Sequence, residues 1–139
     1  MAVLASVEGA VDVRRADAAG WTRASVDEAF CAGDTIRVRR NSRGTLILAD
    51  HTLVRLGGST TVTLTGPRED KGFLIRLLEG ITHYMSRVPR ALNVDTPFVN
   101  AGVEGTEFLV RVTDAQTLVS VFEGKVAMEN DNGRLLLTR

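Results

Sequence analysis

Cysteine, lysine and long hydrophobic runs are scarce in this sequence. Cys31 is the only cysteine among 139 residues, so no disulfide can form within the chain and a disulfide-stapled scaffold is excluded. Of the seventeen basic residues, only Lys71 and Lys125 are lysines. No apolar run reaches the roughly 18 to 20 residues that a membrane-spanning helix requires. The sequence therefore predicts a chain without a membrane span, whose fold is held by packing alone.

Charge of one sign is also lacking, because seventeen acidic residues balance the seventeen basic ones. The protein as a whole has no field that would attract nucleic acid or an anionic membrane. The densest basic group spans residues 37–43, yet no aromatic residue lies between Phe30 and Phe73 to stack on nucleic-acid bases. We therefore predict no binding of nucleic acid.

Clustered metal ligands are a third absence. Cys31, His51 and His83 do not have the spacing of any metal motif, and no fourth ligand accompanies them. The "GGST" segment at residues 57–60 lacks the lysine and the following helix that a phosphate-binding loop needs. The sequence thus predicts no metal, no cofactor and no enzymatic activity. His51 is expected at a hairpin tip, His83 at an exposed strand position and Cys31 in the interior.

What the sequence does contain is a series of short runs, rich in Val, Leu and Thr, in which apolar and polar residues alternate. A period of two is typical of half-buried β-strands. Turn signals separate the runs, as at residues 32–34, 41–44 and 57–59. Only residues 25–30 leave room for a single helical turn, with Ser25 as its cap. The clearest runs are AVDVRR, TIRVRR, TLILAD, TVTLTG, FLVRV and KVAMEN.

A Glu-Gly pair recurs at residues 8–9, 79–80, 104–105 and 123–124. Glycine among many short strands predicts stacked coils or hairpins, because glycine adopts the positive φ angles of tight corners. The spacing between the pairs varies. The expected fold is therefore an all-β, irregular β-solenoid-like stack of short strands, with a two-sheet β-sandwich as the alternative. Residues 65–73 are expected to form a long surface loop within one domain that spans residues 1–139.

Taken in order, the runs and turns form a longer pattern. It consists of "VEGAVDV", "GWTRA", the stretch from "CAGDTIRVRR" to "TTVTL", "LLEGITHYM", "NVDTPFVNAGVEGTEFLVRV" and "VFEGKVAMEN". This pattern closely resembles the FecR-type domain of the bacterial cell envelope, and the resemblance covers essentially the whole chain. Its most specific parts are Gly33-Asp34 before a strand, Thr96-Pro97, and Gly105-Thr106-Glu107-Phe108.

The resemblance implies a solenoid-like or sandwich-like domain outside the cytoplasm, commonly in the periplasm. The best-known members are anti-sigma regulators that pass an iron-siderophore signal from an outer-membrane receptor across the inner membrane. Other members join the domain to peptidoglycan-binding modules or helical repeats, and residues 86–108 resemble that second group more closely. The closing run "RLLLT" is typical of a strand with further chain after it. We therefore interpret the sequence as a piece of a longer protein.

Gly105 and Thr106 have two interpretations. A glycine within a strand most often marks a bulge or the close passage of another backbone, with Glu104 and Glu107 at a solvent-facing kink. The resemblance implies a second role, because several anti-sigma relatives are processed at a Gly-Thr pair. In that case the Thr106 hydroxyl attacks the Gly105 carbonyl carbon and forms an ester that water opens.

Trp21 and the arginines are the candidate binding residues. Arg37 and Arg39 project to one face of a strand and, with Arg43, predict a short basic ridge; the alternative is a solvated face paired with acidic neighbours. Trp21, the only tryptophan, either closes one end of the core or stacks on a sugar ring or a partner side chain.

These patterns lead to two functional hypotheses. The first is a non-catalytic extracytoplasmic binding or scaffolding module that engages a protein or cell-wall partner, by an edge strand or by the Trp21 and arginine surface. The second is an anti-sigma-type signalling domain that is processed between Gly105 and Thr106.

Overall fold

The computed structural model describes residues 1–68, 72–130 and 133–138 of the chain. Twelve strands form one sheet with antiparallel pairing, and the described residues contain no helix, so the predicted all-β fold is confirmed. The strands are β1 (Ala2–Glu8), β2 (Val11–Arg14), β3 (Thr22–Arg23), β4 (Ala29–Phe30), β5 (Thr35–Val38), β6 (Arg43–Leu48), β7 (Leu53–Leu56), β8 (Thr60–Arg68), β9 (Gly72–Asp95), β10 (Asn100–Val112), β11 (Thr117–Asn130) and β12 (Gly133–Thr138).

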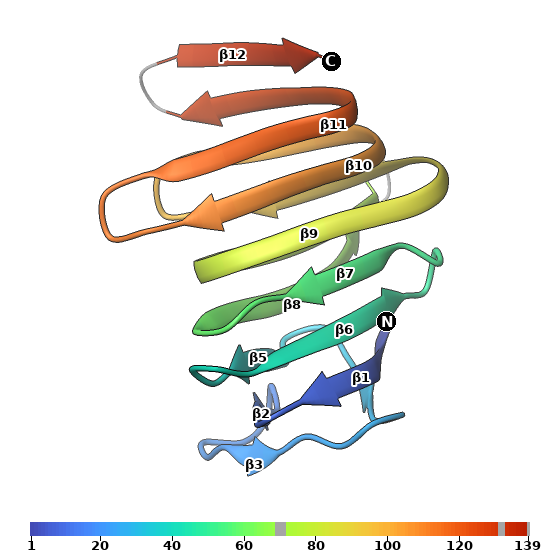
Figure 1. Ribbon diagram of the computed structural model, residues 1–139, viewed down its shortest axis with the longest axis vertical. Helices are drawn as coiled ribbons and strands as arrows, with labels where there is room; N and C mark the ends of the chain where they lie inside the picture. Colours follow the sequence, from blue (N-terminus) through green and yellow to red (C-terminus); the bar gives the residue numbers. More distant parts are fainter. Residues whose placement is uncertain (69–71, 131–132, 139) are drawn as a thin grey trace.

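The sheet curls into two walls because β9 belongs to both of them (Figure 1). Residues 72–79 of β9 pair with β8, whereas residues 82–85 pair with β7. On one side of β9 the order continues through β8, β5, β2 and β3, and on the other side through β7, β6, β1 and β4. We call the first group wall A and the second group wall B. The two walls enclose a common core.

The last three strands extend the stack beyond β9. β10 pairs with β9 on one side and with β11 on the other, and β12 pairs with residues 125–130 of β11. The strands β9, β10 and β11 are long and curve around one side of the molecule (Figure 1). A register shift between Gly105 and Glu107 marks a bulge in β10, and bulges of this kind bend strands. The expected stack is present, but its C-terminal strands are long and bent rather than short.

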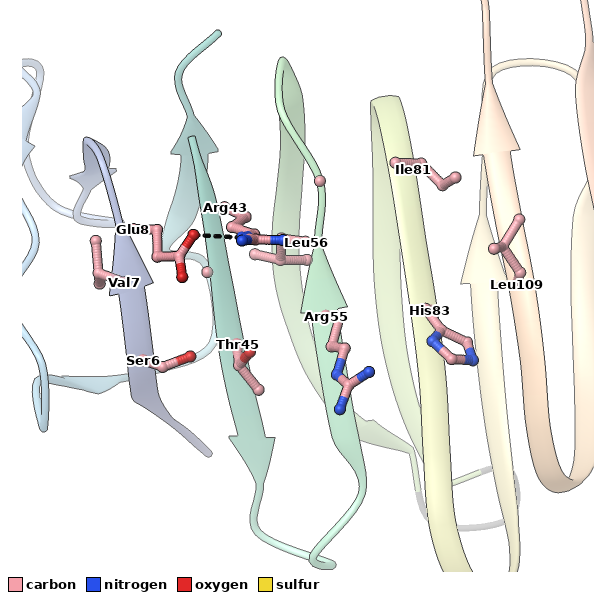
Figure 2. Close-up of a pocket in the computed structure, with 12 residues that line it drawn as sticks. Ser6, Val7, Glu8, Arg43, Thr45, Arg55, Leu56, Ile81, His83 and Leu109 are labelled. Atoms are coloured by element: carbon pink, nitrogen blue, oxygen red, sulfur yellow. Dashed lines mark hydrogen bonds and ion pairs between the residues drawn. The ribbon is translucent and has the colours of Figure 1, made fainter. Parts of the chain in front are cut away.

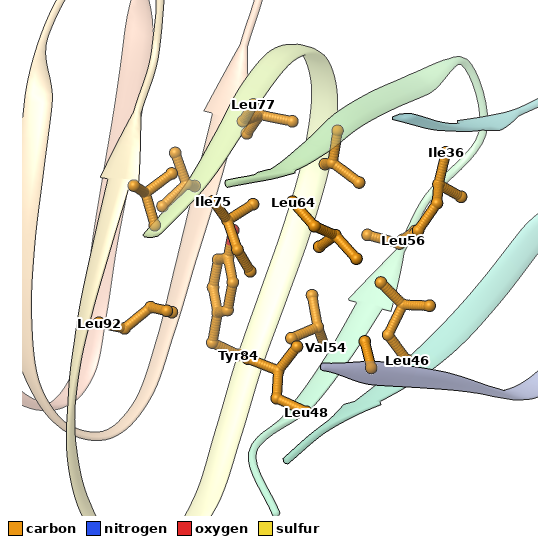
Figure 3. Close-up of a cluster of buried hydrophobic side chains, with 14 of the residues drawn as sticks. Ile36, Leu46, Leu48, Val54, Leu56, Leu64, Ile75, Leu77, Tyr84 and Leu92 are labelled. Carbon is orange, nitrogen blue, oxygen red and sulfur yellow. The ribbon is translucent and has the colours of Figure 1, made fainter. Parts of the chain in front are cut away.

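Alternate residues of several strands, such as β6 and β7, point into the core (Figure 3). On β6, Leu46 and Leu48 are buried, whereas the side chain of Ile47 between them is exposed. This is the period of two that the sequence predicts, and burying one such leucine contributes about 1.5–3 kcal/mol. Both walls contribute to one cluster of buried side chains, which includes Ile36, Leu64, Ile75 and Leu77 of wall A and β9, and Leu46, Val54, Leu56 and Tyr84 of wall B and β9.

An aromatic pair connects this core to the C-terminal strands. Tyr84 of β9 lies opposite Phe108 of β10, and their rings stack with centroids 4.5 Å apart and planes 12° from parallel. The Thr82 hydroxyl donates a hydrogen bond of 2.9 Å to the Tyr84 hydroxyl oxygen. Burial raises the pKa of Tyr84 above its ordinary value, so this hydroxyl stays protonated in the core.

The prediction of a long loop at residues 65–73 is wrong. β8 continues to Arg68, β9 begins at Gly72, and these two residues pair directly. Residues 69–71 lie outside the described residues. Pro67 does not end β8: it lies opposite Phe73 of β9, just after a register shift between Leu64 and Gly66, and proline is tolerated in strands at such irregularities.

The predictions for residues 25–28 and for Cys31 are wrong, whereas the prediction for His51 is confirmed. Residues 25–28 form a turn rather than a helical turn, with the Glu28 N–H donating to the Ser25 carbonyl oxygen and Asp27 at φ 71°. Cys31 is exposed, so its predicted interior position is wrong. Its side chain points outward because the neighbouring Phe30 occupies the core. His51, at φ 69°, lies at the tip of the β6–β7 hairpin, as predicted.

Candidate binding surfaces

Three arginines surround one buried carboxylate on the outer face of wall A. Asp12 of β2 lies opposite Arg23 of β3 and Arg37 of β5. Its two oxygens accept hydrogen bonds from Arg39 Nε at 2.7 Å, Arg23 Nε at 3.1 Å and Arg37 Nη2 at 3.3 Å. Asp12 is only 3% exposed, whereas the Arg23 and Arg39 side chains are more than half exposed. The arginines therefore cover the carboxylate and face solvent themselves.

This arrangement keeps Asp12 ionised. Burial alone would raise the pKa of Asp12, but the hydrogen bonds from Arg39, Arg23 and Arg37 outweigh burial and hold the pKa below its ordinary value. Three guanidinium groups around one carboxylate leave an excess of positive charge at the surface. Each guanidinium has five N–H donors, so most donors remain available to solvent or to a ligand.

Trp21 lies beside this cluster. The guanidinium carbon of Arg37 lies 4.0 Å from the centroid of the Trp21 ring, and that of Arg14 lies 5.1 Å from it. Trp21 is half-buried and does not belong to the buried core, so it does not close the end of the core. The structure thus brings together Trp21, Arg37 and Arg39 from the sequence prediction. We call the group Arg14, Trp21, Arg23, Arg37 and Arg39 the tryptophan–arginine surface.

Arg43 is separate from this group. It lies on β6 in wall B, where its Nε donates to Glu8 Oε2 at 2.5 Å (Figure 2). Both side chains are largely exposed, so this ion pair is screened by solvent. The predicted basic ridge from Arg37 to Arg43 is therefore divided, because the turn between β5 and β6 carries the chain from wall A to wall B.

The Glu8–Arg43 pair borders a groove of about 510 Å³ on the outer face of wall B (Figure 2). Its polar lining includes Thr45, Arg55 and His83, which lie opposite one another on β6, β7 and β9. Ile81 and Leu109 give it an apolar side. Sequence reasoning missed this groove, because each strand contributes one or two residues and only the strand register brings them together.

Glu107 of the predicted motif binds His83. His83 Nε2 lies 2.8 Å from Glu107 Oε2, and the Phe122 ring lies edge-on to the imidazole at 5.9 Å between centroids. His83 is half-buried rather than exposed, so that expectation is wrong. The cross-strand contact with Glu107 covers the ring, and no local sequence signal connects two residues 24 positions apart.

The Gly33-Asp34 pair organises the loops at one end of wall A. Asp34 is buried and accepts hydrogen bonds from Arg15 Nη1 at 2.8 Å, from the Cys31 N–H at 2.8 Å and from the Ala16 N–H at 3.0 Å. Burial alone would raise the pKa of Asp34, but these bonds lower it. Gly33 is at φ 93°, and a Cβ there would lie 2.6 Å from the Ala16 Cβ. The pair therefore has a structural role.

Thr96-Pro97 forms the turn between β9 and β10. The Thr96 N–H donates to the Val99 carbonyl oxygen at 3.0 Å, and the Val99 N–H donates to Thr96 Oγ1 at 3.1 Å. Thr96 Oγ1 also lies 2.8 Å from Thr117 Oγ1 at the start of β11. Pro97 follows Thr96 where a fixed φ suits a turn. This motif connects two successive hairpins.

Gly105 lies where two backbones pass closely, as predicted. A Cβ at Gly105 would lie 2.6 Å from the Glu123 carbonyl oxygen and 2.7 Å from the Gly124 Cα. The bulge that the sequence predicts at this position is also present. Thr106 Oγ1 is buried and has no hydrogen-bond partner within the described residues. The structure thus explains Gly105 by packing, and it leaves the Thr106 hydroxyl without a structural role.

Residues 1–68, 72–130 and 133–138 hold no group of three or more His, Cys, Asp or Glu side chains arranged to bind a metal ion. Across these same ranges, no helix is long and apolar enough to cross a membrane.

Comparison with known proteins agrees with this architecture. Residues 34–127 match the FecR protein family, and because they make up more than half of the chain, the protein belongs to that family. The fold is similar to the crystal structure of a putative anti-sigma factor from Parabacteroides distasonis, with a TM-score of 0.63 and 24% sequence identity. The similar region covers 75% of this chain and 50% of that one, so this chain spans about half the length of its structural relative. No curated protein matches the sequence.

Proposed function

We propose that this protein is a non-catalytic, extracytoplasmic binding module of the bacterial envelope that engages a protein or cell-wall partner. Membership of the FecR family supports an envelope role related to signalling. The observation that carries the proposal is the stacking of Arg37 on Trp21 beside the Asp12 cluster. This surface joins an aromatic ring to several guanidinium groups, a combination that is frequent at the energetic centres of interfaces.

The chemistry of the surface favours an acidic partner. The excess positive charge around Asp12 attracts carboxylates or phosphates, and guanidinium groups bind such groups through paired hydrogen bonds. Asp12 and Trp21 hold the arginines in place before the partner arrives, which reduces the conformational entropy lost on binding. Acidic patches of proteins and the stem-peptide carboxylates of peptidoglycan both offer the required chemistry.

Co-sedimentation with purified peptidoglycan sacculi tests the cell-wall partner. We expect Trp21→Ala and Arg37→Gln each to weaken binding about tenfold or more, because tryptophan and arginine dominate interface energetics. The matched controls are Phe98→Ala, which removes an exposed aromatic ring in the β9–β10 turn, and Arg55→Gln, which removes a guanidinium on wall B. Equal binding by all four variants and the parent protein would contradict a role for this surface.

A photocrosslinking amino acid tests the protein partner. Placed at position 14, beside Trp21, it should capture an envelope protein that the same group at position 55 does not capture. Trp21→Ala in the same chain should abolish that crosslink. If neither binding to sacculi nor formation of a crosslink depends on Trp21, the proposed surface is not the binding site.

Self-processing at Gly105-Thr106 is a second candidate function, favoured by the buried Thr106 hydroxyl, which has no hydrogen-bond partner among the described residues. In this reaction Thr106 Oγ1 attacks the Gly105 carbonyl carbon, the peptide bond breaks, and the Thr106 nitrogen takes the hydroxyl proton. Water then hydrolyses the resulting ester, which leaves a Gly105 carboxylate and regenerates the Thr106 hydroxyl.

Intact-mass spectrometry separates this candidate from simple binding. Self-processing predicts two fragments whose masses sum to that of the chain plus one water, with Thr106 as the new N-terminus. Thr106→Ala should remain whole, whereas Thr106→Ser, which keeps a hydroxyl, should still be cut. A single unchanged mass after days at neutral pH would count against self-processing of the isolated protein.

A further inference from the structure

The groove on the outer face of wall B contains a cation without a protein partner. Arg55 of β7 lies between its cross-strand neighbours, Thr45 of β6 and His83 of β9 (Figure 2). Arg55 is exposed, and none of the residues that the structure describes forms a hydrogen bond or an ion pair with its guanidinium group. The Thr45 hydroxyl likewise has no hydrogen-bond partner in the described ranges. The N–H donors of Arg55 are therefore available to a ligand.

The other charged groups at the groove already have partners. Among the described residues that line it, Glu8 is the only carboxylate, and Arg43 binds it. His83 is held by Glu107, which does not line the groove and whose Oε2 lies 2.8 Å from Nε2 of the imidazole. With His83 neutral, the lining carries one net positive charge, because Glu8 offsets Arg43 and leaves Arg55. A monoanion would therefore neutralise the groove.

The groove also has room for the body of a small molecule. Gly57 lies two positions after Arg55 on the same face of the sheet, and it has no side chain to fill the space beside Ile81. A Cβ at Gly57 would lie 2.4 Å from Ile81 Cγ2. Ile81 and Leu109 form the apolar side of the groove, and both are partly exposed. The groove volume of about 510 Å³ lies within the range of small-molecule sites, about 300–1,000 Å³.

We propose that this groove binds a small organic monocarboxylate with a short apolar body. The two carboxylate oxygens accept parallel hydrogen bonds from the Arg55 guanidinium group, whose planar geometry matches a carboxylate. The Thr45 hydroxyl donates a further hydrogen bond, and the apolar body packs on Ile81 and Leu109. A phosphate monoester fits less well, because it carries roughly two negative charges at pH 7 and the groove has one unpaired cation beside the carboxylate of Glu8.

This inference goes beyond the proposed function. It concerns a free small molecule on wall B, whereas the tryptophan–arginine surface on wall A is proposed to bind a protein or the cell wall. Arg55→Gln therefore remains a control for that surface, and a crosslinking group at position 55 should still capture no protein. The two proposals can fail independently of each other.

Nuclear magnetic resonance titration of the isotope-labelled protein tests the site. Hexanoate is the probe, and hexanol and hexylamine are its matched neutral and cationic analogues. We expect hexanoate to cause saturable shifts of the backbone amide signals of Thr45, Arg55 and His83. Hexanol and hexylamine should bind at least tenfold more weakly, because neither accepts charge-assisted hydrogen bonds from the guanidinium group.

Arg55 is the residue on which binding should depend most. Arg55→Gln should weaken the binding of hexanoate about tenfold or more, because an amide has neither the charge nor the paired donors of a guanidinium group. Arg55→Lys, which keeps the charge but not the planar pair of donors, should have an intermediate affinity. The matched control is Arg76→Gln, which removes an exposed guanidinium group opposite Thr63 of wall A and should leave the affinity unchanged.

Leu109 tests the apolar part of the site. In the parent protein, hexanoate should bind about tenfold more tightly than acetate or better, because its longer chain packs on Ile81 and Leu109. Leu109→Ala should reduce this difference and leave the affinity for acetate unchanged. Leu109 is partly exposed, so the variant should fold. Leu136→Ala, at a 63% exposed leucine of β12, is the matched control and should keep the full difference.

Several results would overturn the inference. One is the absence of saturable shifts with hexanoate, and another is equal binding of hexanoate and hexanol. Equal affinities of Arg55→Gln and Arg76→Gln would show that Arg55 takes no part. Shifts centred on Trp21 would assign the anion to the tryptophan–arginine surface. Inorganic phosphate that displaces hexanoate at equal concentration would assign the groove to a phosphorylated ligand instead.

Discussion

Gly105 and Gly124 lie directly opposite each other on β10 and β11, and neither position has room for a side chain. A Cβ at Gly124 would lie 2.6 Å from the Glu104 carbonyl oxygen and 2.6 Å from the Gly105 Cα. The reciprocal contacts of Gly105 are equally short. Both glycines follow a glutamate, so two of the four Glu-Gly pairs of the sequence meet across the strands at the bulge.

Gly105→Ala should therefore destabilise the protein. The added methyl group meets backbone atoms, which cannot move aside as a flexible side chain can, and overpacking of this kind costs about 1–3 kcal/mol. Chemical denaturation of Gly105→Ala beside Gly102→Ala measures the effect. Gly102 lies on the same strand, and a Cβ there would meet its nearest atom, Asn93 Oδ1, at 3.4 Å. Equal stability of the two variants would show that the strands separate easily at this point.

Acid should unfold the protein partly through Asp12 and Asp34. Their pKa values lie below the ordinary 3.8 in the folded protein, so the unfolded chain binds protons more readily. Above pH 3.8, both carboxylates therefore contribute fully to the free energy of unfolding. This contribution is lost as the pH falls through the pKa values that the two groups have in the folded protein. When unfolding is measured as a function of pH, Asp34→Asn should lose less stability in acid than the parent protein does. An identical pH profile would mean that Asp34 keeps its ordinary pKa.

Removal of the Phe108 ring should cause a large loss of stability. Phe108 is 4% exposed and stacks on Tyr84, and truncation of a buried phenylalanine costs about 3–5 kcal/mol. Phe98→Ala is the matched control, because Phe98 is 40% exposed in a turn and its removal should change stability by about 0.5 kcal/mol or less. Thermal or urea unfolding distinguishes them. A loss of similar size at both positions would be inconsistent with the packing described.

Thr82 and Thr106, whose hydroxyl oxygens are both buried, should respond differently to replacement by valine. Thr106 Oγ1 has no partner in the described part of the chain, so Thr106→Val removes an unsatisfied polar atom and should leave stability unchanged or raise it by about 1 kcal/mol. The Thr82 hydroxyl donates to Tyr84, so Thr82→Val should cost about 1–3 kcal/mol. Urea denaturation of both variants provides the comparison. A clear loss in Thr106→Val would reveal a contact for that hydroxyl.

The sequence alone predicts features that depend on residues close together along the chain. Leu46 and Leu48 alternate with outward residues, and this pattern predicts a strand whatever the strand pairs with. His51 at a hairpin tip and Gly105 at a bulge follow from local backbone preferences in the same way. The order of such local signals along the chain is also what makes the family resemblance visible.

The sequence pattern does not predict features that depend on which residues the strand register places opposite each other. Arg37 and Arg43 are six positions apart and lie on different walls, because the chain turns between β5 and β6. The Asp12 cluster brings together residues as far apart as 27 positions. The exposure of Cys31 depends on Asp34, which accepts its N–H and fixes the tight turn at residues 31–34. A residue's type does not specify such partners.

The layered pairing of the C-terminal strands has a consequence for how the molecule opens. β12 is held by β11, β11 by β10 and β12, and β10 by β9 and β11, so each strand depends on its immediate neighbours for backbone pairing. The stability of such a stack is approximately a sum of terms within each layer and between neighbouring layers. Weakening one pairing should therefore loosen the adjacent strands first, and faster exchange of their amide protons with solvent would report it.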